Sequence, residues 1–325
     1  MTDANCIFHF IKDDLEILEK ALYEAVTSSA PLIGEIGAHL VRSGGKRLRP
    51  ALCLLAARSG PSFDRTQAIP LATAIELIHM ASLVHDDVID CAGTRRGALT
   101  ANARWGNQAA VLTGDHIFAQ AFSILSGHGY TDAIGNRLSM LVKNLCAGEI
   151  LQDMALYTAE HSVEEYERRI GLKTADFLAL CCEIGAMAGG ADEETTAGLK
   201  AYGRAVGMAF QITDDLLDIM GDAERLGKPA GNDIRQGVVT LPVIRAMETS
   251  AERDELRVLV TDREMTDEAV VRALRIVHAS DGCEFAQARA DAYIAEARRV
   301  LPAGVTGEIR ECFLRVADYI AERDF

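Results

Sequence analysis

Residues 76–97 read Glu-Leu-Ile-His-Met-Ala-Ser-Leu-Val-His-Asp-Asp-Val-Ile-Asp-Cys-Ala-Gly-Thr-Arg-Arg-Gly, an apolar run that ends in three aspartates and a pair of arginines. On a helix, the carboxylates of Asp86, Asp87 and Asp90 fall within an arc of about 100°. Like charges on one helical face repel each other, so a cation is needed to compensate them. Clustered carboxylates beside arginines indicate a magnesium ion and a phosphate, whereas a solvated acidic turn is the alternative.

A second acidic triplet with the same spacing lies further along the chain. Residues 210–218 read Phe-Gln-Ile-Thr-Asp-Asp-Leu-Leu-Asp, so Asp214, Asp215 and Asp218 again follow an apolar helical run. If the two helices face each other, six carboxylates converge, and without cations their burial would be very unfavourable. We therefore predict a divalent metal site formed by the two triplets.

The hydrophobic pattern is helical along nearly the whole chain. Helices are predicted over residues 8–28, 64–91, 99–125, 132–159, 162–188, 194–220, 240–249, 252–261, 267–279, 284–300 and 307–322. The breaks are short and rich in turn residues, and no stretch shows the alternation of a strand. We find no internal repeat and no low-complexity linker, so the pattern predicts one all-α domain over residues 1–325.

Composition narrows the classes of function. The formal net charge of −15 argues against a nucleic-acid-binding protein, which usually carries a basic surface. The N-terminus lacks the pattern of a signal peptide, and no apolar run reaches the length of an uncharged membrane span. The eight cysteines form no C-x-x-C pair, so we expect reduced thiols and a cytoplasmic protein without a membrane span.

Taken together, the motifs resemble those of the trans-prenyl diphosphate synthases of the polyprenyl synthetase family. Besides the triplets and Arg95–Arg96, the matching pieces are residues 44–50, 76–79, 148–152, 173–175 and 210–211, in the family's order within residues 40–245. The resemblance implies an isoprenoid synthase-type helical bundle around a central cavity. It also implies Mg²⁺-dependent, head-to-tail condensation of isopentenyl diphosphate with an allylic diphosphate.

The resemblance also assigns site residues. Asp86, Asp90, Asp214 and Asp218 would bind three Mg²⁺ ions that bridge the diphosphate, with Asp87 and Asp215 as further ligands or as supports for them. Isopentenyl diphosphate would be held by Lys46, Arg49, His79 and Arg96, the allylic diphosphate by Arg95 and Lys228, and the developing cation would be lined by Lys173, Thr174 and Gln211. Read without the resemblance, His79 is more typical of a core histidine, and we expect Arg47 at the surface.

One departure from the family pattern concerns assembly. Family members usually carry Glu-Gly-Lys where residues 236–238 here read Gln-Gly-Val, so a cation expected near the diphosphate is missing at Val238. Catalytic subunits of some two-component long-chain synthases also lack it. By resemblance the chain is therefore expected to form a homodimer or a heteromer with a second subunit.

Product length is predicted from the residues before the first triplet. Ala81 and Ser82 lie about one helical turn before Asp86, where short-chain relatives commonly carry a bulky residue. Small side chains leave room for a product of six or more isoprene units, with Phe118 and Phe122 as candidates for the tunnel floor.

Three alternative functions are considered. The first is a farnesyl or geranylgeranyl diphosphate synthase. The second is a terpene cyclase, which would not need Lys46, Arg49 and His79. The third is a non-catalytic subunit, which would be expected to lose a triplet.

Overall fold

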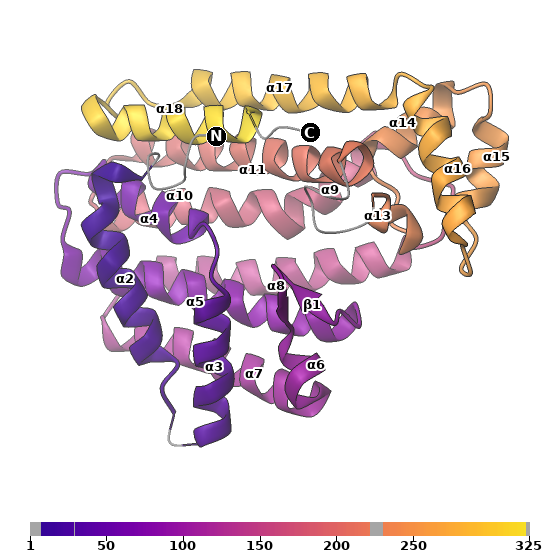
Figure 1. The fold of residues 1–325 in the computed structure, drawn as a ribbon. Coiled ribbons are helices and arrows are strands. Elements are labelled where there is room, and N and C mark those ends of the chain that lie inside the picture. The colour runs from indigo at the N-terminus through magenta and orange to yellow at the C-terminus, as the bar shows by residue number, and fades with distance from the viewer. Residues whose placement is uncertain (1–7, 29, 222–229, 323–325) are drawn as a thin grey trace. The chain divides into compact units, whose positions relative to one another are not determined.

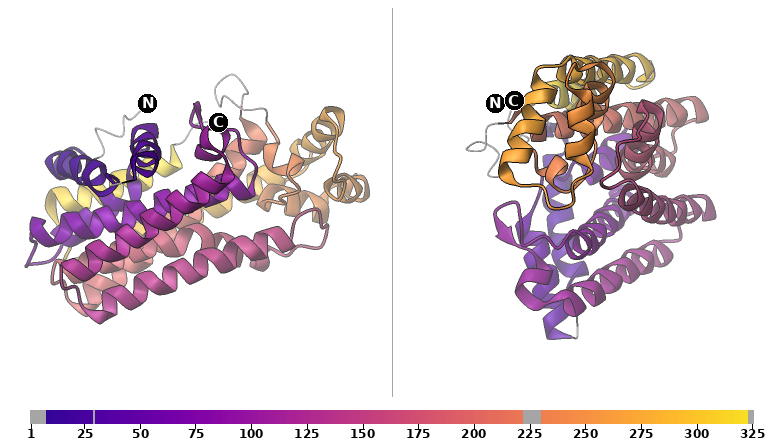
Figure 2. Two further views of the ribbon diagram at one scale, coloured as in Figure 1. Left: turned by 90° about the horizontal axis from the view of Figure 1, so that it is seen from below. Right: turned by 90° about the vertical axis from the view of Figure 1, so that its right-hand side faces the viewer.

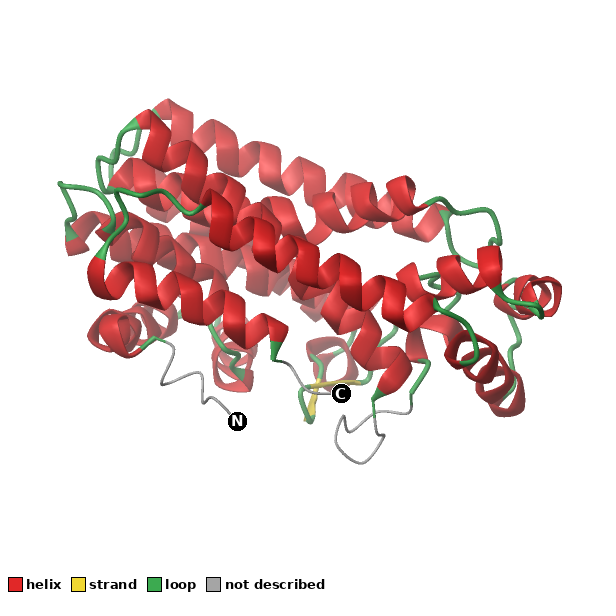
Figure 3. Cartoon of the chain, turned by 90° about the horizontal axis from the view of Figure 1, so that it is seen from above, coloured by secondary structure: helices red, strands yellow, loops and turns green. Residues whose placement is uncertain are grey.

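The computed structural model describes residues 8–28, 30–221 and 230–322, and these are almost entirely helical (Figures 1 and 3). The helical elements in chain order are η1 (His9–Ile11), α2 (Lys12–Ala25), α3 (Pro31–Ser43), α4 (Leu48–Arg58), α5 (Arg65–Ile89), α6 (Ala101–Trp105), α7 (Asn107–Gly127), α8 (Asp132–Met154), α9 (Val163–Ile170), η2 (Gly171–Ala175), α10 (Asp176–Ala188), α11 (Glu193–Met220), α13 (Asn232–Arg235), α14 (Leu241–Thr249), α15 (Arg253–Val260), α16 (Asp267–His278), α17 (Gly282–Val300) and α18 (Gly307–Ala321). The all-α prediction is confirmed.

The structure departs from the predicted elements in several places. The short helix α13 was not predicted, and the helix predicted over residues 99–125 is broken at Gly106 into α6 and α7. Helices α3 and α4 were not among the predicted ranges, and a small antiparallel hairpin, β1 (Thr94–Arg95) with β2 (Ala98–Leu99), follows the first acidic triplet. Two-residue strands are too short to show alternation, which explains why the sequence did not predict them. The predicted helix over 162–188 is continuous but contains the π-helical turn η2.

Contacts divide the chain into two compact units, each assembled from segments that alternate along the sequence. Unit 1 comprises Met1–Ser139, Leu180–Lys200 and Pro302–Phe313, and unit 2 comprises Met140–Ala179, Ala201–Leu301 and Leu314–Phe325. The single domain predicted over residues 1–325 stays a prediction.

Helix α5 forms the centre of unit 1 and ends in the first acidic triplet. It begins after Asp64, whose side chain caps the helix by accepting from the Thr66 N–H, and it packs against α2, α4 and α7 (Figure 2). Its length and composition would suit a membrane span, but 72% of its most apolar 18-residue window is buried in the protein. Burial of this kind is typical of a core helix in a globular protein.

Glycines allow two helices of unit 1 to approach each other closely. A Cβ atom at Gly185 of α10 would clash with the backbone carbonyl of Cys53 in α4, and one at Gly189 would clash with that of Ala57. These glycines are four residues apart, so they lie on one face of the helix. The backbone of α10 therefore packs directly against α4, the helix that carries Arg49.

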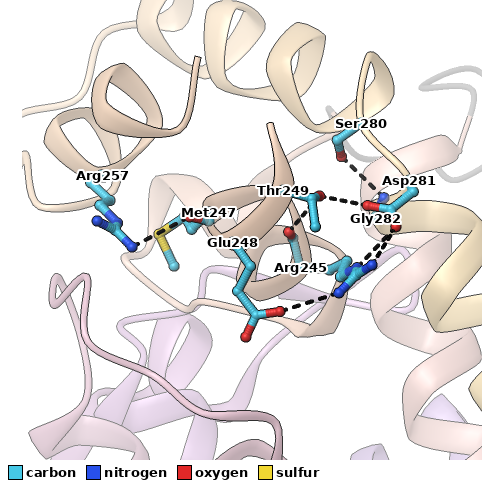
Figure 4. Close-up of polar contacts among 8 residues, drawn as sticks. All are labelled: Arg245, Met247, Glu248, Thr249, Arg257, Ser280, Asp281 and Gly282. Atoms are coloured by element: carbon cyan, nitrogen blue, oxygen red, sulfur yellow. Dashed lines mark hydrogen bonds and ion pairs between the residues drawn. The ribbon is translucent and has the colours of Figure 1, made fainter. Parts of the chain in front are cut away.

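In unit 2, the core beneath the second triplet is formed by apolar residues of α9, α11, α14, α16 and α17. A polar network also connects α14 to the start of α17, because the Arg245 guanidinium binds Asp281 at 2.7 Å and the Thr249 hydroxyl donates to the same carboxylate (Figure 4). Exposed ion pairs contribute only about 0–1 kcal/mol each. The buried apolar core, rather than this network, therefore supplies most of the stability.

Replacing Gly185 with alanine should destabilise the protein, because the new methyl group would meet the backbone of α4. The expected loss in the free energy of unfolding is about 1–3 kcal/mol, and urea denaturation measures it. Gly135→Ala is the matched control, since no atom lies within 4 Å of a Cβ built there in helix α8. This control should be neutral or stabilising by up to about 1 kcal/mol. Equal losses in both variants would contradict the close packing of α4 and α10.

Candidate active site

The first acidic triplet lies at the C-terminal end of α5 and presents its three carboxylates differently. Asp87 is buried, with 3% of its surface exposed, and accepts a hydrogen bond of 2.7 Å from Arg95 Nε of the hairpin. Asp86 is partly exposed, and Asp90, the residue that ends the helix, is exposed. The first and third carboxylates are therefore accessible, whereas the middle one is held by the protein.

Basic residues surround a pocket beside this triplet. Its lining consists of His39, Leu40, Ser43, Gly44, Arg47, Glu76, His79, Met80, Leu83, Asp87, Arg95, Arg96, Leu99, Thr100 and Ala101. Arg96 has a left-handed backbone (φ 52°) in the hairpin turn, and its guanidinium lies against Gly45. The hairpin thus brings the Arg95–Arg96 pair to the loop that contains Lys46, whose own side chain is exposed.

His79 and Arg49, two predicted ligands of isopentenyl diphosphate, contact each other in unit 1. Arg49 Nη1 lies 3.1 Å from His79 Nε2, and because a guanidinium can only donate, Nε2 must be the acceptor. Burial lowers the pKa of His79 well below its usual value, and the charges of Arg49 and Arg96 lower it further. The imidazole is therefore neutral at pH 7 and keeps its other nitrogen as a donor.

Arg47 is buried, so the prediction of a surface position was wrong. Its guanidinium binds Glu76 of α5 at 2.7 Å and Glu19 of α2 at 2.6 Å, and it donates to the Val41 carbonyl. Burial raises the pKa of Glu76, but Arg47 opposes this shift. A left-handed backbone at Arg47 (φ 48°) turns the side chain inward, a conformation that the sequence pattern does not reveal.

The second triplet, in α11 of unit 2, shows the same division of roles. Asp214 is exposed and Asp218 is partly exposed, while Asp215 is buried. Tyr166 Oη donates to Asp215 Oδ2 at 2.6 Å, and Gln211 Nε2 donates to Oδ1 at 2.8 Å. Burial raises the pKa of Asp215 to about 7, outweighing the two hydrogen bonds that lower it. Sequence reasoning missed Tyr166, because nothing in the triplet's spacing points to a residue 49 positions away.

The π-helical turn η2 carries Lys173 and Thr174, two of the residues predicted to line a developing cation. Thr174 Oγ1 donates to Gln211 Oε1 at 2.8 Å, and Lys173 Nζ binds Glu149 of α8 at 2.8 Å. A Cβ at Gly148 would lie 3.3 Å from Leu172 Cβ, so the glycine lets α8 approach this turn. Unit 2 therefore places Lys173, Thr174 and Gln211 beside the second triplet, and Glu149 holds the lysine.

The residues predicted to set product length differ in how far they are buried. Ala81 is fully buried, and Ser82 is partly buried with its hydroxyl donating to the His79 carbonyl. The Phe118 ring lies 5.7 Å from the ring of His85, next to the first triplet, whereas Phe122 is 37% exposed. Val238 is partly buried. Lys228 lies outside the described residues.

The chemistry of the donor set fits a magnesium–diphosphate complex. In the part of the chain that the structure describes, no three His, Cys, Asp or Glu side chains form a ready-made metal cluster. Mg²⁺ usually keeps waters and binds through one or two carboxylates together with substrate phosphates. The pairs Asp86/Asp90 and Asp214/Asp218 each offer such carboxylates, one helical turn apart on one face.

The chain is similar to known proteins over most or nearly all of its length. The sequence profile described as Polyprenyl synthetase matches residues 30–277. Heptaprenyl diphosphate synthase component 2 of Geobacillus stearothermophilus is 40% identical over 319 residues, which cover 98% of each chain. The crystal structure of heptaprenyl diphosphate synthase from Staphylococcus aureus gives a TM-score of 0.90 at 31% identity, covering 97% of this chain and 99% of that one. A polyprenyl synthase from Caulobacter crescentus CB15, complexed with calcium and isoprenyl diphosphate, gives 0.92 at 32% identity, covering 99% and 98%.

Arg47→Met should lower the free energy of unfolding by about 3–5 kcal/mol, because it leaves the buried Glu76 carboxylate without its main counter-charge. Urea denaturation at pH 7 measures this loss. The double variant Arg47→Met/Glu76→Leu removes both charges and should recover most of it. If the double variant is no more stable than the single one, the loss in Arg47→Met does not come from an unpaired Glu76 carboxylate but from the other contacts of Arg47, with Glu19 and the Val41 carbonyl.

Proposed function

Because the chain belongs to the polyprenyl synthetase family, we propose that it condenses isopentenyl diphosphate head to tail with an allylic diphosphate to make a long-chain trans-polyprenyl diphosphate. It is a trans-prenyltransferase with the isoprenoid synthase-type helical fold, as its similarity to solved structures shows. The product has six or more isoprene units. Relatives named heptaprenyl diphosphate synthase support this length.

The observation that carries the proposal is the shared design of the two acidic triplets. In each, the middle aspartate is buried and held by protein donors, and the first and third are partly or fully exposed on one helical face, although Asp218 Oδ2 also accepts from the Asp233 N–H at 3.0 Å. A protein that used these carboxylates only as a solvated acidic surface would not need to bury the middle one, since burial of a carboxylate is costly. The arrangement suits binding of a metal–diphosphate complex.

We assign the accessible carboxylates, Asp86, Asp90, Asp214 and Asp218, as the Mg²⁺ ligands, and Asp87 and Asp215 as their supports. Magnesium bound there supplies positive charge that neutralises the diphosphate as the allylic carbon–oxygen bond breaks. Three ions are proposed by family resemblance. The complex of the Caulobacter crescentus protein with calcium and isoprenyl diphosphate supports a divalent cation at such sites.

The basic pocket of unit 1 is the proposed binding site for isopentenyl diphosphate. Arg96 lines this pocket, and by family resemblance Lys46 and Arg49, which lie next to its lining residues Arg47 and His79, supply further charge. This charge is needed because the overall charge of −15 repels an anionic substrate. His79, neutral and hydrogen-bonded to Arg49, contributes a donor. Arg95 and Lys228 are proposed to contact the allylic diphosphate.

The residues around η2 are proposed to stabilise the allylic cation while isopentenyl diphosphate attacks it. Thr174 and Gln211 present oxygen atoms, whose lone pairs favour a nearby positive charge. Lys173 is kept in place by Glu149, which also offsets its charge. This assignment gives residues 148–152 a role that the sequence alone did not define.

The assembly is proposed to involve a second subunit or a second copy of the chain. The name of the Geobacillus stearothermophilus relative, component 2, supports a two-component enzyme, as does the valine at position 238. A homodimer is the alternative. The free thiols of the seven described cysteines support the cytoplasm as the proposed location, because disulfides are rare there.

Incubating the purified chain with labelled isopentenyl diphosphate, farnesyl diphosphate and Mg²⁺ tests the activity. Asp86→Ala and Asp214→Ala should each reduce turnover by at least about 100-fold, because each removes a proposed metal ligand. Asp132→Ala, which removes an exposed carboxylate at the start of α8, should not. Activity that appears only when a partner protein is added would support the two-component form. Full activity in either ligand variant would refute the metal assignment.

Ala81→Phe should shorten the product by at least one isoprene unit, because a large ring would fill space beside α5 one turn before Asp86. Chromatography of the dephosphorylated product measures its length. Ser82→Phe, at a partly buried position, serves as the second variant if the fully buried Ala81 does not accept the ring. An unchanged product distribution in both folded variants would show that α5 does not limit chain length, and would favour Phe118 or Phe122.

A further inference from the structure

The middle aspartates of the two triplets are held in chemically different ways. Asp87 binds a cation, Arg95, at 2.7 Å. Asp215 binds two neutral donors instead, the Tyr166 hydroxyl and the Gln211 amide, one on each carboxylate oxygen. The positive charge of Arg169 also lowers the pKa of Asp215, but its guanidinium donates to the Val239 carbonyl, and both hydrogen bonds to the Asp215 oxygens come from neutral donors. The position of Asp215 therefore depends on hydrogen-bond geometry more than that of Asp87 does.

Tyr166 is well suited to impose that geometry. It lies in α9, which begins with a complete capping box between Ser162 and Glu165, and its side chain is only 1% exposed. The Arg169 guanidinium, 5.7 Å from the ring centroid, is itself anchored by donating to the Val239 carbonyl at 2.7 Å. Burial, the capped helix α9 and the contact with Arg169 therefore restrict the position of the phenol independently of its hydrogen bond to α11.

Holding Asp215 also fixes the rotation of α11 about its axis. At 100° per residue, Asp214 and Asp218 point within about 40° of each other, while Asp215 points about 60–100° away from them. With both oxygens of Asp215 bound on the core side, Asp214 and Asp218 lie on the more exposed side of the helix, where the Asp233 N–H also donates to Asp218 Oδ2 at 3.0 Å. A small rotation of the helix would separate them from a shared ligand.

We propose that Tyr166 is a positioning residue for metal binding: its hydroxyl holds Asp215 and thereby orients Asp214 and Asp218. The inference rests on the proposed function, because that function assigns these carboxylates as ligands. Residues that orient metal ligands through hydrogen bonds typically change metal affinity by about 10- to 100-fold when they are replaced.

Tyr166→Phe removes the hydroxyl and keeps the buried ring. Tyr202→Phe is the matched control, since Tyr202 is also buried in α11 but lies about 18 Å along the helix from Asp214. Isothermal titration of Mg²⁺ in the presence of inorganic diphosphate measures affinity without turnover. We expect a loss of about 10-fold or more in Tyr166→Phe and less than about twofold in Tyr202→Phe.

Enzyme kinetics give a second readout. The Mg²⁺ concentration for half-maximal activity should rise in Tyr166→Phe, while the KM for isopentenyl diphosphate, whose proposed pocket lies in unit 1, should stay within about twofold of the wild-type value. A purely structural role of Tyr166 would lower the thermal stability of Tyr166→Phe and leave its Mg²⁺ dependence unchanged. Equal Mg²⁺ affinities in the two variants would overturn the proposal.

A double-mutant cycle covers the case in which Tyr166→Phe is unstable. Asp215→Leu removes the carboxylate, so adding Tyr166→Phe to it leaves neither partner of this hydrogen bond unpaired. The proposal expects no further loss of Mg²⁺ affinity from the second substitution, and an additive loss would contradict it. If the wild-type protein binds Mg²⁺ and diphosphate but transfers no prenyl group, the proposed function fails while the role of Tyr166 is still tested.

Discussion

Burial of one carboxylate in each acidic triplet is the constraint on which the candidate site depends. A carboxylate withdrawn from water must have its oxygens satisfied, or it costs several kcal/mol. Asp87 meets this requirement through Arg95, and Asp215 meets it through Tyr166 and Gln211. These bonds connect α5 to the hairpin and α11 to α9, so each triplet is held by a second element of its own unit.

The positive charges are also placed locally, beside the first acidic triplet. The chain has far more acidic than basic side chains, yet its pocket gathers Arg47, Arg95 and Arg96 within unit 1. Arg47 is already committed to Glu76 and Glu19, so it organises the pocket rather than adding free charge. Local placement, not net charge, therefore decides how an anion can bind to this protein.

The sequence alone predicted the helical fold, both triplets and the motif residues around them, because helical periodicity and repeated spacing are local signals. It did not predict the burial of Arg47, which depends on a left-handed backbone, or the hairpin at Thr94–Leu99, which is too short to show a pattern. Tyr166 was missed for a different reason. Its partner Asp215 is distant in the sequence, so only the packing of α9 against α11 reveals it.

The π-helical turn η2 has a consequence for how this segment can evolve. A π turn uses more residues than an α turn, so it delays the rotation of the chain and keeps Thr174 near the face that carries Tyr166. Both residues can then bond to the same helix, through Gln211 and Asp215. Because the π turn holds about one residue more than an α turn over the same rotation, deleting a single residue here would leave a regular helix in which the later side chains of α10 keep their orientation, while the residues within the turn shift relative to α11. A change in length inside η2 would therefore disturb the contacts of Thr174 with Gln211 and of Lys173 with Glu149 rather than the packing of α10.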